Sequence, residues 1–357
     1  MKKILIISFF LFTVVLIAEE IQKLRPYKLI NADSLRMKSI NENYVTFLYG
    51  NVHFFYGETE FFSNEAQIFE KRKVAKLYGD VKIFDDTLSV YSDETTYLRN
   101  KEKLIITGNA LFKETHSDST FRTFETEIFE YDRNKKLIIA NQEVRSYDSR
   151  KSIHHKSGYL YYEIDNGYGY LMKQPIVYIS GKDSLLIKSE KMEFFKDYDK
   201  IVASFDVTTQ NIDLNIQSDF LVYFSKEERA LFTGNPIFHS ESANTRSKEL
   251  TVYFKENDIE QAILRDSSRI DFGNNSEEKS NWIIADKMNI LFVNKKIDIC
   301  NAKGNVSSFV EESDKNKKKF INKVKGNKMI VKMQNDNKVK SIEIIENVEG
   351  TYFFEQK

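Results

Sequence analysis

One short string recurs along this chain and limits what it can fold into. Residues 48–54 read Leu-Tyr-Gly-Asn-Val-His-Phe, residues 77–83 read Leu-Tyr-Gly-Asp-Val-Lys-Ile, and residues 106–112 read Ile-Thr-Gly-Asn-Ala-Leu-Phe. The glycines of these copies, Gly50, Gly79 and Gly108, follow one another at intervals of 29 residues, and weaker copies surround Gly234 and Gly304. A fixed period of about 30 residues is typical of a repeat architecture, in which each repeat packs against its neighbours.

A second recurring element centres on a small residue that we use as the anchor of each repeat. Residues three and five positions after the anchor are mostly apolar, and the residue between them is mostly polar. This two-residue alternation is typical of a β-strand with one buried face. The anchors are Ala32, Ser63, Ser92, Thr123, Ser157, Ser189, Ser218, Ser247, Ala285 and Gly326.

The positions of the anchors predict how the chain is organised. They indicate about ten repeats in one continuous array over residues 26–357. Glycines cluster at Gly167 and Gly169, so a division into two halves, about 26–150 and 151–357, is the alternative.

The anchor also marks a bend. Residues two positions before it are apolar, yet they have the opposite parity to the apolar residues that follow it. A pleated strand keeps both sets on one face only if an extra residue or a bend separates them. Glycine within a strand indicates a second bend. We therefore predict an all-β fold, an elongated β-jelly-roll of bent strands that form two facing antiparallel sheets.

The apolar columns of the repeats predict which side chains lie between the two sheets. These side chains either meet as an ordinary closed core or leave a V-shaped groove, in which each buried methylene of a lipid chain would contribute roughly 0.8 kcal/mol. The predicted lining residues are Val52, Phe54, Ala66, Ile68, Val81, Ile83, Tyr97, Ala110, Phe112, Ile128, Tyr162, Phe194, Leu221, Tyr223, Val252 and Ile290.

Charge and residue chemistry argue against several classes of function. Lys plus Arg and Asp plus Glu are both 53, so no net charge attracts nucleic acid. Of the five histidines only His154 and His155 are adjacent, and neighbours in a strand point to opposite faces. Cys300 is the single cysteine; we predict a buried apolar residue there. We predict no catalytic residues, metal site or cofactor.

One basic run carries two interpretations. Lys317, Lys318 and Lys319 lie in a polar insert near the C-terminus. The first interpretation is a solvated loop. The second, functional interpretation is a contact with an anionic lipid headgroup.

The N-terminus differs in composition from the rest of the chain. Two lysines precede an apolar run over residues 4–17, and Ala18 is followed by two glutamates. This pattern predicts a signal peptide over residues 1–18, with an uncleaved anchor in the inner membrane as the alternative.

The repeated aliphatic-x-Gly-Asn/Asp-Val strands, alternating with small-x-x-aliphatic-x-aliphatic strands behind a signal-like segment, resemble the OstA-like (LptA-like) family. This family supplies the periplasmic bridge proteins of lipopolysaccharide transport and the N-terminal domain of the outer-membrane translocon. The resemblance covers about residues 26–357. The chain is about twice as long as the simplest members, and it lacks the translocon's C-terminal membrane barrel.

The resemblance implies a periplasmic, non-enzymatic protein that binds lipopolysaccharide, or another envelope lipid, in a hydrophobic groove and helps to carry it to the outer membrane. It also implies end-to-end association with related Lpt components. The hydrophobic last strand at residues 350–354 and the strand around residues 29–37 are the predicted contact edges. The alternative is a structural or adhesive β-solenoid with a closed core. A carbohydrate-active β-helix enzyme would need aligned carboxylates, which the repeat columns lack.

Overall fold

The computed structural model describes residues 27–41, 43–180, 184–211, 214–240, 243–255, 258–272, 281–313, 319–334 and 339–354. The predicted signal peptide at residues 1–18 lies outside this part of the chain. In the described part, no helix is long and apolar enough to cross a bilayer.

The secondary structure of these residues is almost entirely β-strand, with one short 3₁₀ helix, η1 (Lys196–Tyr198). The strands are β1 (Tyr27–Asn31), β2 (Ser34–Ile40), β3 (Asn43–Tyr56), β4 (Thr59–Phe69), β5 (Val74–Asp85), β6 (Leu88–Leu98), β7 (Lys103–Thr115), β8 (Phe121–Asp132), β9 (Leu137–Asp148), β10 (Ile153–Glu163), β11 (Tyr168–Met172), β12 (Ile176–Ile179), β13 (Leu185–Lys188), β14 (Lys191–Phe195), β15 (Lys200–Gln210), β16 (Leu214–Phe224), β17 (Arg229–Thr233), β18 (Ile237–Ser240), β19 (Ala243–Arg246), β20 (Glu249–Lys255), β21 (Asp258–Phe272), β22 (Asn281–Val293), β23 (Lys296–Ser313), β24 (Lys319–Met333), β25 (Val339–Ile345) and β26 (Glu349–Phe354).

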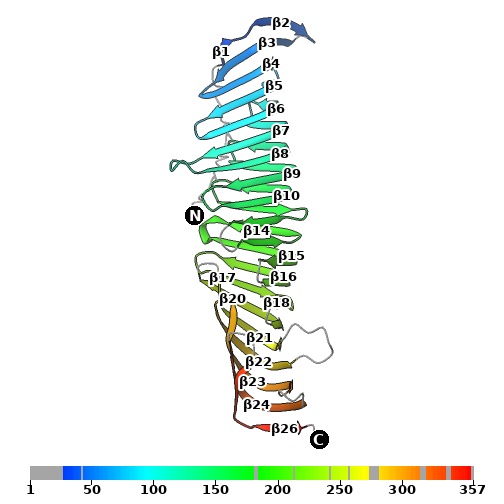
Figure 1. Ribbon diagram of the computed structural model, residues 1–357. Helices are drawn as coiled ribbons and strands as arrows, with labels where there is room; N and C mark the ends of the chain where they lie inside the picture. The colour runs from blue at the N-terminus through cyan, green and yellow to red at the C-terminus, as the bar shows by residue number, and fades with distance from the viewer. Residues whose placement is uncertain are drawn as a thin grey trace, which may run out of the picture.

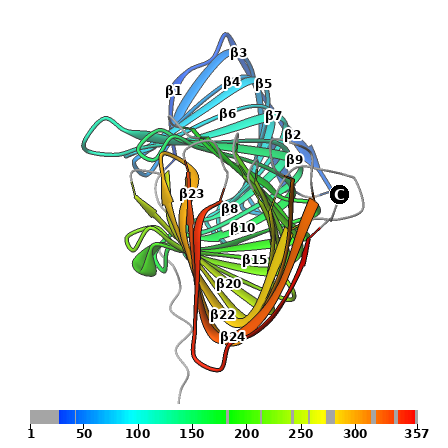
Figure 2. The ribbon, with the colours of Figure 1, turned by 60° about the horizontal axis from the view of Figure 1, so that its bottom comes forward.

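The described strands form one 26-stranded antiparallel sheet that is stacked along a single long axis (Figure 1). Each long strand pairs with the next one along the chain, as β3 does with β4 and β4 with β5. Each also bends near its middle, so that the sheet folds into two facing walls that meet along an apex. Figure 2 shows this V-shaped cross-section at the C-terminal end. The predicted all-β, elongated β-jelly-roll class is confirmed.

We call the two sides of the fold the first wall and the second wall. In the N-terminal repeats the first wall contains residues 45–49, 65–69 and 74–78, and the second wall contains residues 52–56, 59–63 and 81–85. Hairpin turns alternate between the two free margins, which we call the first rim and the second rim. For example, β4 and β5 connect at the first rim, and β5 and β6 at the second.

The apex is a line of β-bulges, and the recurring glycine lies on it. The pairing of β3 with β4 shifts register between Tyr49 and Val52, because Gly50 and Asn51 both have left-handed backbone angles (φ +71° and +46°). Two consecutive residues in this conformation turn the strand and restore the inward parity of the apolar residues. This is the second bend that glycine within a strand predicts. The predicted parity change lies at the anchor of the neighbouring strand, where Ser63 and Ala66 are both buried.

Glycine marks only part of the apex. Consecutive left-handed residues recur along the described chain in every successive repeat, and several of these pairs contain no glycine. The pairs are 50–51, 79–80, 108–109, 142–143, 173–174, 205–206, 234–235, 266–267, 304–305 and 346–347. Each non-glycine residue in the left-handed conformation lowers the stability of the fold by roughly 1–2 kcal/mol. In the repeats without glycine, tertiary packing must therefore stabilise the bend.

An acid or amide one position after the anchor completes the apex. Three aspartates accept a hydrogen bond from the side-chain amide of the asparagine that follows the apex glycine in the next strand. The pairs are Asn51 with Asp33, Asn109 with Asp93, and Asn305 with Asp286. The distance from Asn109 Nδ2 to Asp93 Oδ2 is 2.8 Å. The Asn of the Gly-Asn string therefore ties neighbouring strands together at the bend.

The anchor residues form the inner side of the apex. Ser63 Oγ donates to the carbonyl oxygen of Glu65 at 2.8 Å, and Ser157, Ser218 and Ser247 make the same contact two residues ahead. In β8 this contact belongs to Thr126, which is buried. The predicted anchor Thr123 is therefore wrong by three residues.

Candidate functional site

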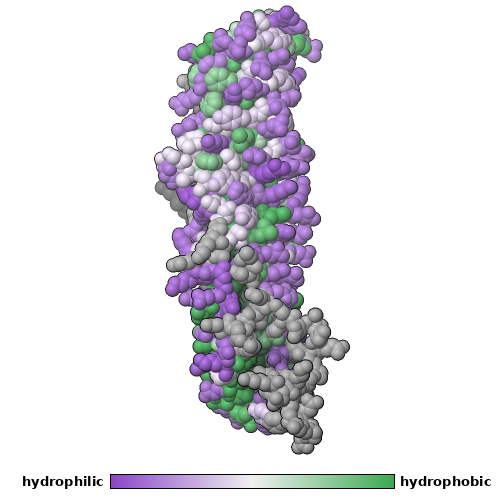
Figure 3. Space-filling view, viewed as in Figure 1, coloured by the Kyte–Doolittle hydropathy of each residue, from purple (hydrophilic) through white to green (hydrophobic). Residues whose placement is uncertain are grey.

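A continuous apolar interior lies between the two walls. A single cluster of buried side chains extends from Leu48 in β3 to Met333 in β24, while polar residues cover most of the outer face seen in Figure 3. We call this interior the slot.

Aromatic side chains fill the slot and touch across it. Tyr97 of the first wall lies with its ring centroid 5.5 Å from those of both Tyr56 and Phe61 in the second wall. Phe112 of the second wall lies 4.9 Å from Phe129 of the first. These contacts bring the walls together, so the slot is closed by packed side chains in this structure.

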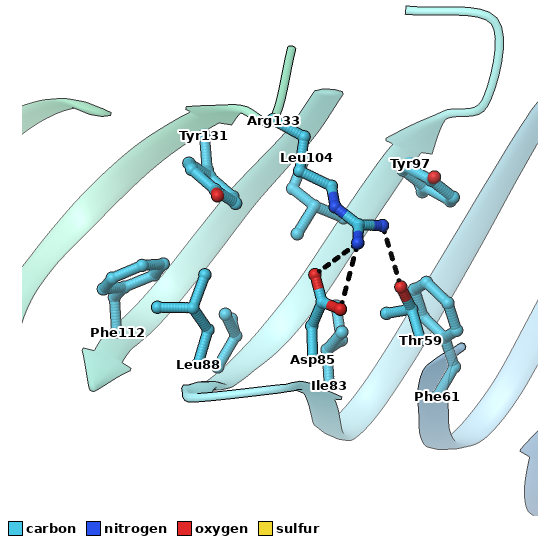
Figure 4. Close-up of a pocket in the computed structure, with 11 residues that line it drawn as sticks. Thr59, Phe61, Ile83, Asp85, Leu88, Tyr97, Leu104, Phe112, Tyr131 and Arg133 are labelled. Atoms are coloured by element: carbon cyan, nitrogen blue, oxygen red, sulfur yellow. Dashed lines mark hydrogen bonds and ion pairs between the residues drawn. The ribbon is translucent and has the colours of Figure 1, made fainter. Parts of the chain in front are cut away.

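A small cavity remains in the slot at the N-terminal repeats (Figure 4). Its volume is about 20 Å³, close to the room that a single water needs. Phe61, Ile83 and Phe112 line it from the second wall, and Tyr97, Leu104 and Tyr131 from the first. A lipid chain can occupy this place only after the two walls move apart.

Arg133 closes the mouth of this cavity. It lies in the turn after β8 on the first rim, and Figure 4 shows its guanidinium reaching the second rim. Its Nη2 is 2.8 Å from Asp85 Oδ2, and its Nη1 donates to Thr59 Oγ1 at 2.9 Å. These contacts span 48 and 74 residues of sequence and join the two rims.

Two residues of the first wall hold Arg133 in place. Glu102 Oε2 lies 3.5 Å from Arg133 Nη1 and accepts a hydrogen bond of 2.7 Å from the Tyr97 hydroxyl. Burial raises the pKa of Tyr97, and the bond to Glu102 raises it further. Tyr97 therefore remains a hydrogen-bond donor at any physiological pH.

Further polar contacts cross the slot beside Arg133. The Arg99 guanidinium on the first rim lies 5.8 Å from the ring centroid of Tyr56 in the second wall. Arg122 of the second wall donates to the Tyr162 hydroxyl of the first at 3.0 Å. At the rims, Lys151 Nζ lies 3.1 Å from Asp199 Oδ1. Cations thus connect the two walls at several levels.

Burial in the slot keeps the His155 side chain uncharged. Its ring faces the slot, with Nδ1 in contact with the Ser146 hydroxyl, and Nε2 is shielded without a hydrogen-bond partner. Burial lowers its pKa from 6.5 to about 3, and the nearby positive charge of Arg122 contributes. His155 is therefore neutral in the folded protein at pH 5.

This shift predicts a loss of stability in mild acid. The unfolded chain binds a proton at His155 below pH 6.5 and the folded chain does not until about pH 3, so stability is present above pH 6.5 and falls as the pH decreases. Between pH 7.5 and 5, wild-type protein should lose about 2 kcal/mol more unfolding free energy than His155→Gln. Chemical denaturation at both pH values measures this difference.

The neighbouring histidine supplies the control. His154 lies on the outer face, where it stacks on Tyr147 at 4.5 Å. If His154→Gln alters the pH dependence as much as His155→Gln does, the assignment to the slot-facing ring is wrong.

Most of the residues predicted to line the interior lie in the slot. Tyr162, Phe194 and Tyr223 are half-buried against the cluster. Those that are fully buried are Val52, Phe54, Ala66, Ile68, Val81, Ile83, Tyr97, Ala110, Phe112, Leu221, Val252 and Ile290.

Ile128 is an exception. Because the anchor of β8 is Thr126, the interior positions belong to Phe129 and Tyr131, both buried, and Ile128 is only half-buried outside the core cluster. The prediction that Ile128 faces the interior is wrong. The three-residue misalignment in this repeat explains the error.

The basic run lies almost wholly outside the described residues. Lys317 and Lys318 are not in the described part, and Lys319 begins β24. Their suggested contact with a lipid headgroup stays a prediction.

Cys300 is fully buried in β23, as predicted, and burial raises the pKa of its thiol to about 12. A thiol in this state is inert as a nucleophile. Among the described residues, no group of three or more His, Cys, Asp or Glu side chains is arranged to hold a metal ion.

Sequence reasoning missed the polar contacts that cross the slot. Arg133 falls in a turn between two strands, and its partners are distant in sequence. The sequence pointed only weakly to this contact, through the positions of the two residues at strand ends. Asp85 ends a strand at one rim, and Arg133 follows a strand that ends at the other.

Comparison with known proteins agrees with these features over part of the chain. Residues 27–165 match the family model described as OstA-like protein. No curated protein matches the chain significantly.

Among solved structures, the chain is similar to the crystal structure of LptH, the LptA homologous periplasmic component of the conserved lipopolysaccharide transport device from Pseudomonas aeruginosa. The two share 11% identity over 42% of this chain and 83% of that chain, with a TM-score of 0.29. A likeness of this degree carries no argument by itself. The match to the OstA-like protein model extends from β1 to β10, so over residues 27–165 this chain is similar to the OstA-like protein family.

Proposed function

We propose that this protein binds lipopolysaccharide through its acyl chains in the slot and helps to carry it across the periplasm, as a non-enzymatic bridge. The observation that supports this most is the apolar cluster between the walls, which continues from β3 to β24. An extended apolar interior suits a cargo with several hydrocarbon chains, since each buried methylene contributes roughly 0.8 kcal/mol. The match of residues 27–165 to the OstA-like protein model supports the same cargo.

Binding requires the closed slot to open. The side chains that meet across it, such as Tyr97 with Phe61 and Phe112 with Tyr131, make apolar contacts. Acyl chains can replace these contacts with others of the same kind, while the polar contacts that cross the slot, such as that of Arg122 with Tyr162, must break. Loading therefore exchanges one apolar surface for another.

The second candidate is a structural or adhesive solenoid whose core never opens. The packing itself favours it, because the cavity between Phe61 and Tyr97 has a volume of only about 20 Å³. Under this alternative, the aromatic pairs are simply a core and lipids have no access.

Titration with lipopolysaccharide separates the two. The mature chain, over residues 19–357, should bind purified lipopolysaccharide saturably, and free lipid A should compete while the detached polysaccharide should not. Co-elution in size-exclusion chromatography and intrinsic tyrosine fluorescence both report binding. Absence of saturable binding, or competition by the polysaccharide alone, excludes the acyl-chain proposal and leaves the closed solenoid.

The ends of the array are proposed to join other Lpt components or further copies by edge pairing. In the described chain, β1 and β2 each pair only with β3, and β25 and β26 each pair only with β24. Leu35 and Met37 of β2 are 52% and 62% exposed, and Tyr352 of β26 is 59% exposed. Exposed apolar edge strands are templates for adding another strand.

Cysteine crosslinking tests this head-to-tail contact. Single cysteines at Met37 and Tyr352 should together give concentration-dependent dimers and longer ladders under a short thiol crosslinker. Cysteines at Lys101 and Lys135, which lie in turns on the side of the array, serve as the control pair. Monomer alone from the edge pair at high concentration rules out the contact.

A further inference from the structure

We propose that Arg133 is a latch that holds the two rims of the slot together, and that its release admits acyl chains from the side of the array. This inference rests on the proposed function for the identity of the cargo. Its geometric part, that the latch keeps the walls closed, stands independently.

The position of Arg133 suits a latch because its contacts cross the open margin of the V. Backbone hydrogen bonds join turns of the same rim, as from Arg133 N to Glu102 O at 3.0 Å and from Thr115 N to Thr87 O at 2.9 Å. Between the rims, the contacts at this level are made by side chains, from Arg133 to Asp85 and Thr59. Side-chain contacts can break without any change in strand pairing.

Arg133 has a second carboxylate partner that remains available when the latch is open. Glu102, on the same rim as Arg133, lies 3.5 Å from its guanidinium and is itself held by Tyr97. If Asp85 withdraws, Arg133 keeps a carboxylate partner on its own wall, and Asp85 at the strand end becomes hydrated. Neither charge is then left buried and unpaired, which is the usual obstacle to opening a buried ion pair.

The latch lies directly over the aromatic contacts that close the slot. The cavity between Phe61, Phe112, Tyr97 and Tyr131 is bounded by Asp85 and Arg133 at its mouth (Figure 4). A hydrocarbon chain that enters from the side meets this ion pair before it meets the apolar lining. Arg133 is therefore a positioning residue for the closed state rather than a group that binds the cargo.

Spin-label distances across the mouth test the latch without any lipid. Labels at Thr87 on the second rim and Lys101 on the first rim report the separation of the rims, and buried Cys300 stays unlabelled. Arg133→Met keeps an unbranched apolar stem and removes the guanidinium; it should shift the distance distribution to longer values. Asp85→Asn should give the same shift and serves if the arginine variant folds poorly.

A same-rim ion pair provides the matched control. Arg150 and Asp118 lie 3.1 Å apart on neighbouring turns of the second rim. Arg150→Met should leave the distances unchanged. If Arg133→Met and Asp85→Asn also leave them unchanged, or if Arg150→Met widens them equally, the latch does not exist.

Loading kinetics then connect the latch to the cargo. Arg133→Met should accelerate the association of lipopolysaccharide about tenfold, since hydrogen bonds to charged groups are worth enough to change a rate by that factor. Arg150→Met should not change it. Equal association rates in a protein whose rims have widened would contradict side loading. Failure of every variant and of wild type to bind would overturn the proposed function and leave the mechanical latch standing.

Discussion

Replacing Gly79 by valine is expected to lower the free energy of unfolding of the N-terminal repeats by about 3 kcal/mol. Gly79 has φ +70°, and a Cβ added there would lie 2.7 Å from Nδ2 of Asn64. A β-branched residue is strongly disfavoured at positive φ, and the clash would also push the neighbouring strand away from the apex. The bend that lets both walls face the slot would then fail locally.

Hydrogen exchange measures this effect where it arises, because stability in a repeat array is partly local. Amide protection in β4, β5 and β6 should fall sharply in Gly79→Val and much less in β22 to β24. Gln142→Gly is the matched control, since Gln142 occupies the equivalent apex position with φ +68°. It should be neutral or slightly stabilising. A destabilisation by Gln142→Gly equal to that by Gly79→Val would disprove the strain argument.

Phe112→Ala, which removes the ring, should lower the free energy of unfolding by about 3–5 kcal/mol. Phe112 is 1% exposed and lies within 4.9–6.1 Å of the rings of Phe129, Tyr131 and Phe124. The substitution deletes contacts to both walls at once and enlarges the existing cavity beside it. Denaturant unfolding, followed together with hydrogen exchange in β7 and β8, should show it.

An outward aromatic residue distinguishes the core from the sheet surface. Phe84 lies half-buried on the outer face, 5.9 Å from Phe62 and 6.1 Å from Tyr91. Phe84→Ala should cost only about 1 kcal/mol, the usual value of a cross-strand pair. Similar losses from Phe84→Ala and Phe112→Ala would mean that Phe112 does not bridge the two walls.

Much of the fold follows from local chemistry. The alternation after each anchor placed Ala66, Ile68 and Leu221 in the interior, because a strand with one buried face shows a period of two regardless of distant contacts. The parity change at the anchor predicted the apex, and Gly50 and Gly79 supplied residues that tolerate the required backbone angles.

Other parts of the fold depend on contacts that no local pattern carries. Gln142 and Phe205 adopt left-handed angles although neither favours them, since the strands on both sides impose the bend. In β8 both Thr123 and Thr126 are small residues before an apolar stretch, and only the pairing of Thr126 with the carbonyl oxygens of the next strand decides between them. The wrong choice moved the interior assignment from Phe129 to Ile128.

The slot could be predicted from local sequence patterns, and its latch could not. An apolar interior could be predicted from periodic residues, but whether it was open or closed depended on side chains such as Tyr97 meeting across the walls. Arg133 and Asp85 are 48 residues apart, and nothing in their neighbourhoods links them. The contact arises from the stacking of repeats, which brings turns of opposite rims to one mouth.

Site-specific photo-crosslinking at two adjacent residues tests the central claim most directly. A photoreactive residue at Phe129 would lie in the slot, and the same residue at Ile128 would lie outside the core on the same strand. The account predicts that, after irradiation with lipopolysaccharide, Phe129 forms covalent adducts through the acyl chains and Ile128 forms few or none. Equal labelling at both positions, or adducts at Ile128 alone, would contradict the proposal that the cargo lies between the two walls.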